Sequence, residues 1–249
     1  MITISSINLR FQQGTAEEIP ALVNLDLKIP EKEFLVILGE NGSGKSSLLN
    51  CIAGSLFPDS GKIEIQGQNI TTFPDYRRSR WIARIFQNPL SGTSSDLSIL
   101  ENFRLASQRT RKKLFTIGKN SAFKKEVKEK ISSLGMGLEN KLDTQMGKLS
   151  GGQRQALTLL MAVMDDSKIL LLDEPTAALD PRSSARLMHL ANEIIRTYEL
   201  TAILVTHQMK EAYTYGSRII QMKEGKIIRD LSKEEKALIK QEEMYKWFE

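Results

Sequence analysis

Residues 39–46 combine three glycines, one lysine and two serines at a spacing suited to phosphate chemistry. The segment reads G-E-N-G-S-G-K-S, which fits the pattern G-x-x-x-x-G-K-[ST]. Glycines let the backbone approach phosphate oxygens, and consecutive N–H groups at a helix N-terminus attract anions. Lys45 can then reach the terminal phosphates, while the Ser46 hydroxyl can ligate Mg²⁺. We expect a nucleoside triphosphate site here; a glycine-rich structural turn is the weaker alternative.

Two adjacent carboxylates follow the apolar run Ile169–Leu172. Open parallel sheets bind ligands at the carboxyl ends of their strands. Asp173 can hold Mg²⁺ directly or through water, and Glu174 is placed to polarise an attacking water as general base. Such a pair is otherwise an ordinary solvated strand end about half the time, but next to a phosphate loop the chemical reading is favoured.

A second glycine-rich segment, 149–153, reads L-S-G-G-Q. A serine N-cap followed by two glycines at a helix start is another anion site. Because one bound nucleotide needs one such loop, the second suggests contact with the nucleotide of another copy of the chain.

The elements that must position these residues follow from the hydrophobic pattern. Continuous apolar runs predict strands buried on both faces of a parallel sheet at Phe34–Leu38, Ile169–Leu172 and Ala202–Val205. Helical stretches are expected at Lys45–Ala53, Ser150–Met164 and Pro181–Tyr198, the last with Asp180 as N-cap. Residues 2–11 and 22–29 read as an antiparallel strand pair. The alternation predicts an α/β core, a mostly parallel sheet with helices on both faces, with an antiparallel β subdomain.

Residues 88–148 differ in kind, with helical segments at 99–107 and 121–134 and no convincing strand. Ser232 and Glu235 form the pattern of a capping box for a last helix over 233–248. We therefore expect one domain over 1–249. Its predicted parts are a nucleotide-binding core over 1–87 and 155–231, an inserted helical subdomain over 88–154, and a C-terminal helix within 232–249.

The three motifs together resemble those of the ATP-binding subunits of ABC transporters. Walker A at 39–46, the signature at 149–153 and Walker B at 169–174 match that family in identity, order and spacing. The signature is the most diagnostic of the three, because other P-loop NTPases lack it. The resemblance implies a P-loop ATPase that hydrolyses ATP and uses Mg²⁺.

The resemblance also identifies smaller motifs. Gln87, after the predicted strand 82–86, matches the glutamine that senses Mg²⁺ and the attacking water, and Asp180 matches the loop that touches the opposing protomer. His207 matches the switch histidine at the γ-phosphate, whereas His189 is left as structural. Phe11 stands where an aromatic residue stacks on adenine; a core role is its alternative.

The resemblance thus assigns each site residue a role. ATP contacts are expected from Phe11, Gly39, Glu40, Asn41, Gly42, Ser43, Gly44, Lys45, Ser46 and Ser47. The opposing ATP is expected to meet Leu149, Ser150, Gly151, Gly152 and Gln153. The metal ligands are expected to be Ser46, Gln87 and Asp173, and the catalytic residues Glu174, His207 and Gln87.

The family implies that two copies meet head to tail around two ATP molecules and drive a membrane permease, which a solute-binding protein supplies. The stretch 143–149 lacks the glutamate-bearing element of many exporters, which favours a bacterial importer at the cytoplasmic face of the membrane. The segments 87–93 and 154–162 are similar to ATPases of poorly defined uptake systems, some for aromatic amino acids. The alternatives are a single-cassette soluble ATPase of the iron–sulfur assembly type, and a lipid or lipoprotein exporter ATPase.

The composition of the chain limits these interpretations. The 249 residues carry a formal net charge of +5, with 41% hydrophobic residues and a single cysteine, Cys51, which fits a reducing compartment. The longest apolar runs are far shorter than a bilayer span. The positive charge is concentrated in 109–130, where nine Lys or Arg stand against two Glu, so the rest is slightly acidic. A nucleic-acid partner is therefore not expected; a solvated helix face and attraction to anionic lipids remain the two readings.

Overall fold

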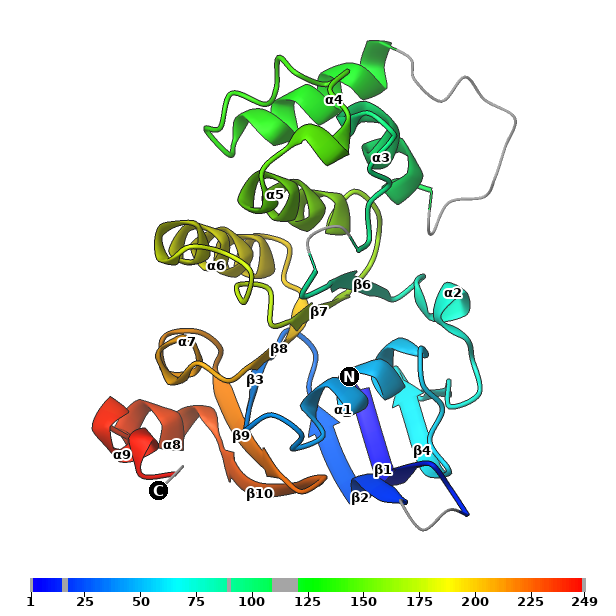
Figure 1. Cartoon of the computed structure of the whole chain (residues 1–249), viewed down its shortest axis with the longest axis vertical. Coiled ribbons are helices and arrows are strands. Elements are labelled where there is room, and N and C mark those ends of the chain that lie inside the picture. The colour runs from blue at the N-terminus through cyan, green and yellow to red at the C-terminus, as the bar shows by residue number, and fades with distance from the viewer. Residues whose placement is uncertain (1, 15–17, 89–90, 109–120, 248–249) are drawn as a thin grey trace. The chain divides into compact units, whose positions relative to one another are not determined.

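The computed structural model describes residues 2–14, 18–88, 91–108 and 121–247, which divide into two compact units. The first unit comprises 1–78, 171–174 and 200–249, and the second comprises 79–170 and 175–199. Their elements are labelled in Figure 1. Of the positively charged segment 109–130, the part from 109 to 120 lies outside the described residues.

The first unit contains an antiparallel sheet. Its strand order is β2 (Ile19–Ile29), β1 (Ile2–Phe11), β4 (Ser60–Ile65) and β5 (Gln68–Asn69). Alternate residues of β1 are buried, as expected of a strand with one face on a core. The pairing of Ile2 with Ile29 and of Leu9 with Leu22 confirms the predicted antiparallel pair.

The second sheet of this unit carries the strands of the nucleotide core. Its order is β10 (Lys226–Leu231), β9 (Arg218–Lys223), β3 (Phe34–Leu38), β8 (Thr201–Thr206) and β7 (Ile169–Asp173). Strand β3 runs parallel to both β8 and β9, whereas β10 returns antiparallel beside β9. Every residue of β3, β7 and β8 is buried, which explains why their sequences are continuous apolar runs. The predicted α/β fold is confirmed, with a mixed sheet and a separate antiparallel sheet.

Helices of the first unit follow the strands. Helix α1 occupies Lys45–Ala53, as predicted, α2 is a single turn at Asp75–Arg78, and α7 occupies Met209–Thr214. The predicted helix over 233–248 is wrong in its continuity. Two short helices form instead, α8 at Lys233–Leu238 and α9 at Gln241–Tyr245, because Ile239 and Lys240 are extended between them. The Ser232–Glu235 capping box is confirmed.

The second unit is mainly helical. It contains β6 (Ile82–Ile85), α3 (Ile99–Ala106), α4 (Ser121–Ser132), the 3₁₀ turn η1 (Met146–Lys148), α5 (Gly151–Ala162) and α6 (Pro181–Thr197). Helix α5 contacts α3, α4 and α6, so it is the centre of this unit. Residues 155–170 and 175–199 belong to the same compact unit as the inserted helices, and the predicted division into core and helical subdomain stays a prediction. Strand β7 begins in the second unit and ends in the first.

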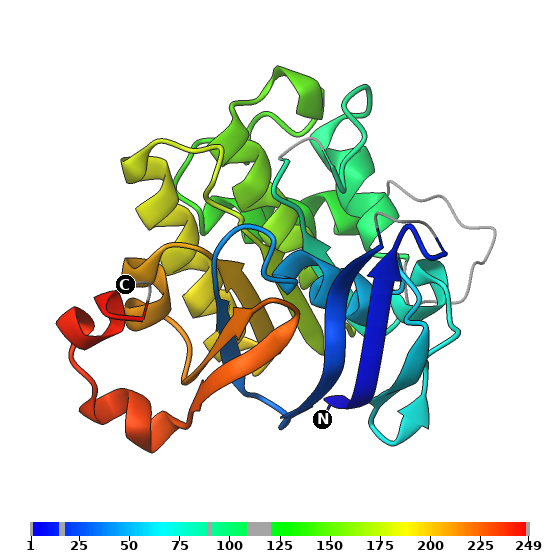
Figure 2. The same ribbon diagram turned by 60° about the horizontal axis from the view of Figure 1, so that its bottom comes forward.

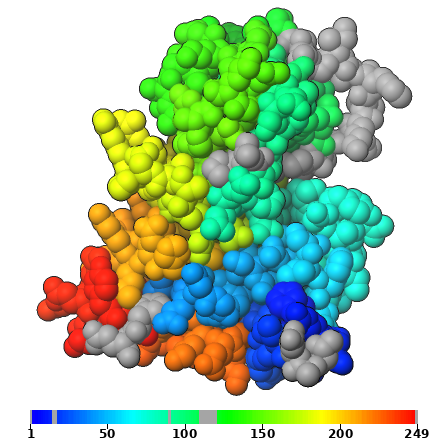
Figure 3. All heavy atoms as spheres, in the orientation of Figure 1, coloured from blue at the N-terminus to red at the C-terminus, as the bar shows by residue number. Residues whose placement is uncertain are grey.

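Figures 2 and 3 show the same elements in a turned view and as atoms. Among the described residues, none of the helices has the length and apolarity that a membrane span requires.

Candidate functional site

The phosphate loop connects β3 to α1 in the first unit. Gly42 and Gly44 have positive φ angles, +81° and +99°, which a side chain would disfavour. A Cβ on Gly44 would also lie 2.5 Å from the carbonyl oxygen of Ala21. The loop therefore depends on glycine both for its backbone conformation and for the space around it.

Helix α1 begins with donors available to an anion. Gly44 is the N-cap of α1, and no side chain of the described residues caps the first turn. That turn also contains no acidic residue. The first N–H groups of a helix have no partner within it and carry the positive end of the helix dipole. The N-terminus of α1 thus fits a phosphate group.

Lys45 is folded back onto the loop. Its Nζ donates to the carbonyl oxygens of Gly39 at 2.8 Å and Glu40 at 2.7 Å. Burial lowers the pKa of Lys45, and the carboxylates of Glu174, Asp173 and Glu40 oppose that shift. The lysine is a buried cation surrounded by acceptors, ready to exchange carbonyls for phosphate oxygens.

Two side chains suited to a metal ion lie beside Lys45. The Ser46 hydroxyl donates to Oδ1 of Asp173 at 3.4 Å. A hydroxyl and a carboxylate fit Mg²⁺, which binds few protein oxygens and completes its shell with water and substrate phosphates. In the part of the chain that the structure describes, there is no group of three or more His, Cys, Asp and Glu side chains that could hold a metal ion.

Glu174 and His207 form a pair next to Asp173. Nδ1 of His207 lies 3.3 Å from Oε1 of Glu174, whose side chain is 14% exposed against 48% for the histidine. Glu174 has φ +41°, a left-handed conformation uncommon for this residue type, and its N–H donates to the carbonyl oxygen of Val205 at 3.0 Å. The end of β8 therefore holds the backbone of the residue that follows β7.

Phe11 ends β1 opposite Ile19, and 39% of its surface is exposed. Its ring is therefore available for stacking, and the alternative of a core role is not supported by that exposure. Ser47 lies half-buried in α1.

The signature segment lies in the second unit at the start of α5. Ser150 is the N-cap: its Oγ accepts from the Gln153 N–H at 3.3 Å, and Oε1 of Gln153 accepts from the Ser150 N–H at 3.2 Å. Gly152 lies so that a Cβ would touch Ser183 at 3.4 Å, an ordinary contact. Leu149 is buried and its carbonyl accepts from Nη2 of Arg154 at 2.9 Å.

Gln87 and Asp180 also belong to the second unit. Gln87 is exposed just after β6. Asp180 caps α6 as predicted, its Oδ1 accepting from the N–H groups of Arg182 and Ser183 at 3.0 Å each. The Ser183 side chain first, and then these backbone bonds, lower the pKa of Asp180. His189 is exposed on α6, 3.6 Å from Glu193, with no further role assigned to it.

Two contacts that position the site were not predicted. Arg154 holds the signature loop from within α5, and the hairpin β9–β10 supports the phosphate loop, with the Gly225 N–H donating to the carbonyl oxygen of Ser43 at 3.1 Å. Arg154 lies in the stretch 154–162, which differs from the usual family helix and therefore stands out in the sequence. The partner of its hydrogen bond could not be predicted from the sequence. The hairpin contact joins residues 182 positions apart, and a glycine in a turn was its one sequence signal.

Comparison with known proteins now adds to this geometry. The model of the ABC transporter family matches residues 22–177. The chain belongs to the ABC transporter family. It is therefore an ATP-binding ATPase subunit of the kind that serves transport.

Individual relatives agree. The chain is 36% identical over its whole length to a tyrosine transport ATP-binding protein of Clostridioides difficile, of which it covers 99%. It is 32% identical, over 92% of its length and 64% of the relative's, to a methionine import ATP-binding protein of Photorhabdus laumondii. Among solved structures, the dimeric ATP-binding cassette MJ0796 bound to ADP and phosphate has a TM-score of 0.79 and 29% identity, with 93% of this chain and 98% of that one covered.

Proposed function

We propose that this ABC ATPase energises the import of a small solute, with an amino acid as the class of cargo. The observation that carries the hydrolytic part is the pairing of Glu174, which directly follows Asp173 in the chain, with His207 in the first unit. The cargo class is supported by the whole-length similarity to a tyrosine transport ATP-binding protein and by a methionine import relative.

In the proposed reaction, Lys45 exchanges the carbonyls of Gly39 and Glu40 for the β- and γ-phosphate oxygens of ATP. Glu174 accepts the proton of the attacking water at its carboxylate, and His207 holds that carboxylate and meets the γ-phosphate. Mg²⁺ held by Ser46 and Asp173, with Gln87 as a further proposed ligand, would neutralise charge on the phosphates. Phe11 would stack on the adenine.

The signature supports a second copy of the chain as partner. Ser150, Gly151, Gly152 and Gln153 would meet the ATP bound to that copy, and Asp180 would lie at the same interface. A homodimer is the proposed assembly, because one chain carries both a phosphate loop and a signature. A permease and an extracytoplasmic binding protein complete the proposed transporter, which places the chain at the cytoplasmic face of the membrane.

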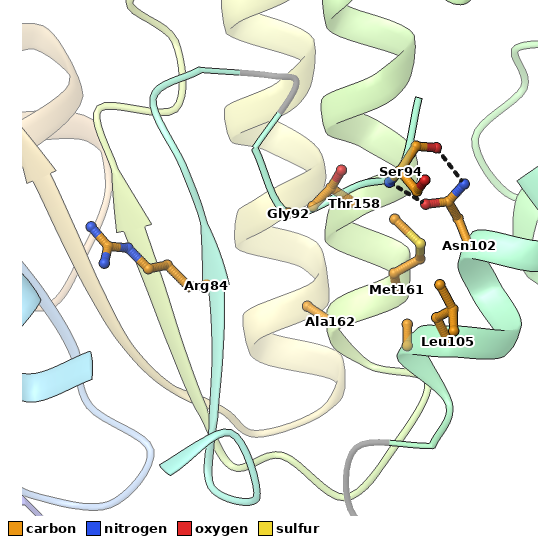
Figure 4. A pocket seen from close by; sticks show the side chains of 9 residues that line it. Arg84, Gly92, Ser94, Asn102, Leu105, Thr158, Met161 and Ala162 are labelled. Atoms are coloured by element: carbon orange, nitrogen blue, oxygen red, sulfur yellow. Dashed lines mark hydrogen bonds between the residues drawn. The ribbon is translucent and has the colours of Figure 1, made fainter. Parts of the chain in front are cut away.

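A pocket of about 250 Å³ in the second unit is the proposed permease contact. Figure 4 shows its lining from β6, the loop that follows, α3 and α5. Asn102 braces the loop, its Oδ1 accepting from the Ser94 N–H at 2.8 Å and its Nδ2 donating to the Ser94 carbonyl at 3.0 Å. Leu105, Met161 and Ala162 give the pocket an apolar wall suited to a short helix of the permease.

The test is purification of the complex from native membranes, followed by reconstitution with the recovered permease. We expect a hydrophobic subunit to co-purify and an amino acid to stimulate ATP hydrolysis severalfold. The variant Glu174→Gln should co-purify equally without turnover, which separates assembly from catalysis. Recovery with a soluble scaffold would instead support the iron–sulfur assembly type, and a lipid-extruding permease would support the exporter type.

A further inference from the structure

Residues 232–247, here called the C-terminal segment, belong to the first unit and pack against two of its elements, α7 and the β9–β10 hairpin. The segment contains α8 and α9, drawn in red beside α7 and β9 in Figure 1. Contacts of α8 with β9 and β10, and of α9 with α7, define its position. Met244 of α9 is fully buried, so the segment is packed rather than loosely attached.

The first contact caps α7. Nζ of Lys236 donates to the carbonyl oxygens of Tyr215 at 2.5 Å and Gly216 at 2.7 Å, at the end of that helix. Burial lowers the pKa of Lys236 to about 8. Helix α7 starts two residues after His207, so Lys236 holds the far end of the helix that follows this histidine.

The second contact involves Trp247 and the hairpin β9–β10. The Trp247 carbonyl oxygen accepts from Nε2 of Gln221 at 3.0 Å, and its ring centroid lies 5.2 Å from the Arg229 guanidinium. Arg229 also donates to Oε1 of Gln221. Since Gln221 is only 3% exposed, this is a closed polar network in which both ends of the amide are used.

The same hairpin supports the phosphate loop. Gly225 donates to the Ser43 carbonyl, and a Cβ on Gly39 would lie 2.5 Å from the carbonyl oxygen of Met222. Trp247 and residues 221–224 enclose, with loop residues 40–43, a cavity of about 360 Å³. Any rearrangement of the loop when Lys45 releases the Gly39 and Glu40 carbonyls therefore changes the surroundings of the indole.

We propose that the C-terminal segment positions the nucleotide site within the same chain. Trp247 acts on the phosphate loop through the β9–β10 hairpin, and Lys236 acts on His207 through α7. Both are positioning residues, and their effects are separable. Loss of the Trp247 contact weakens ATP binding, whereas loss of the Lys236 contact slows turnover.

The Trp247 contact is tested by fluorescence. The chain has two tryptophans, so Trp81→Phe leaves Trp247 as the single indole. Addition of Mg²⁺ and ATP should change its emission. In a Glu174→Gln background, Trp247→Ala should weaken ATP binding about three- to tenfold and Trp247→Phe by less than about twofold. Leu238→Ala, at an 85% exposed position of the same segment, is the matched control and should not differ from the parent. Unchanged emission together with unchanged affinity in Trp247→Ala overturns this half of the proposal.

The Lys236 contact is tested by steady-state kinetics. Lys236→Met should lower kcat about three- to tenfold with KM for ATP within about twofold, and Lys236→Arg should restore most of kcat. Lys236→Gln, whose amide is shorter and uncharged, serves if the methionine variant does not fold, and the same fall in kcat is expected. A fall in kcat that only matches the loss of folded protein, measured by circular dichroism, would mean a purely structural lysine and would reject the proposal, as would an unchanged kcat.

Discussion

The phosphate loop and the signature loop are both glycine-rich segments before a helix, yet their helix starts differ. Helix α1 begins at Gly44 in a left-handed conformation and lacks a side-chain cap from the described residues. Helix α5 begins at Ser150 in an extended conformation, with a capping box closed by Gln153. One start leaves its N–H donors open, whereas the other has already satisfied two of them.

The difference indicates two ways to hold a phosphate. The phosphate loop is completed by its ligand, because its lysine must exchange partners and its open N–H groups must gain one when an anion arrives. The signature already has its own capping box. The Ser150 hydroxyl accepts a hydrogen bond from the Gln153 N–H in it, so its own proton is left to donate. Arg154 adds rigidity by holding the Leu149 carbonyl. The signature is therefore preorganised, as the proposed contact with a nucleotide on another copy requires.

The largest expected effects lie on the side of the phosphate loop. Glu174→Gln should lower ATP hydrolysis by at least about 100-fold, because general-base catalysis contributes about 10²- to 10⁴-fold. ATP binding should persist, since the phosphate loop and Lys45 are intact, and the variant should accumulate as an ATP-bound dimer in gel filtration. Lys45→Ala is the opposite control, with binding lost as well. Near-normal hydrolysis by Glu174→Gln would remove this residue from the role of base.

A matched pair of glycine variants sharpens the comparison. Gly44→Ala should cost about 1–3 kcal/mol of stability, because φ is +99° and the new Cβ would meet the Ala21 carbonyl at 2.5 Å. Gly152→Ala meets Ser183 at an ordinary 3.4 Å and should stay within about 0.5 kcal/mol. Thermal or urea unfolding of both variants is the measurement. Equal losses of stability would contradict the distinction between an open and a self-satisfied loop.

Ser150→Ala tests the signature cap. Its loss should cost about 1 kcal/mol, and ATP binding to a single chain should not change, because the phosphate loop alone carries that binding. Dimer-dependent hydrolysis should fall. Ser150→Thr keeps the hydroxyl and should recover both the stability and the dimer-dependent hydrolysis. Weaker ATP binding by the isolated Ser150→Ala chain would contradict the assignment of the signature to the nucleotide of another copy.

The smallest expected effect concerns α4, in the same unit as the signature. Lys124 and Lys125 are exposed and lie 3.6 Å from Asp143 and 3.9 Å from Glu129. We would replace both by Gln, together with Lys112 and Lys113. The free energy of binding to anionic liposomes, measured by sedimentation, should weaken by about 1 kcal/mol per well-placed charge, and by less at high salt. Lys28→Gln with Lys226→Gln is the control on the first unit. Unchanged sedimentation would leave a solvated helix face as the explanation of the basic segment.

Sequence patterns predicted the elements that local signals specify. Helix α1 and the N-cap of α6 were predicted from a glycine loop and from Asp180-Pro181, and the buried strands from continuous apolar runs. The residues that meet in the first unit could be named because each follows a strand of one sheet. The break at Ile239–Lys240 could not be predicted, since helical propensity continues through it. It is explained by tertiary contacts, of Lys236 with the end of α7 and of Met244 with the core.

The left-handed backbone at Glu174 has a consequence for how the chain would change under selection. Such a conformation costs a non-glycine residue about 1 kcal/mol or more, and a glycine or asparagine would adopt it more readily. A library screened for heat resistance alone should therefore lose the glutamate at this position, whereas a library screened for ATP turnover should keep it. The two screens would select different residues at this position, as expected where stability and activity conflict.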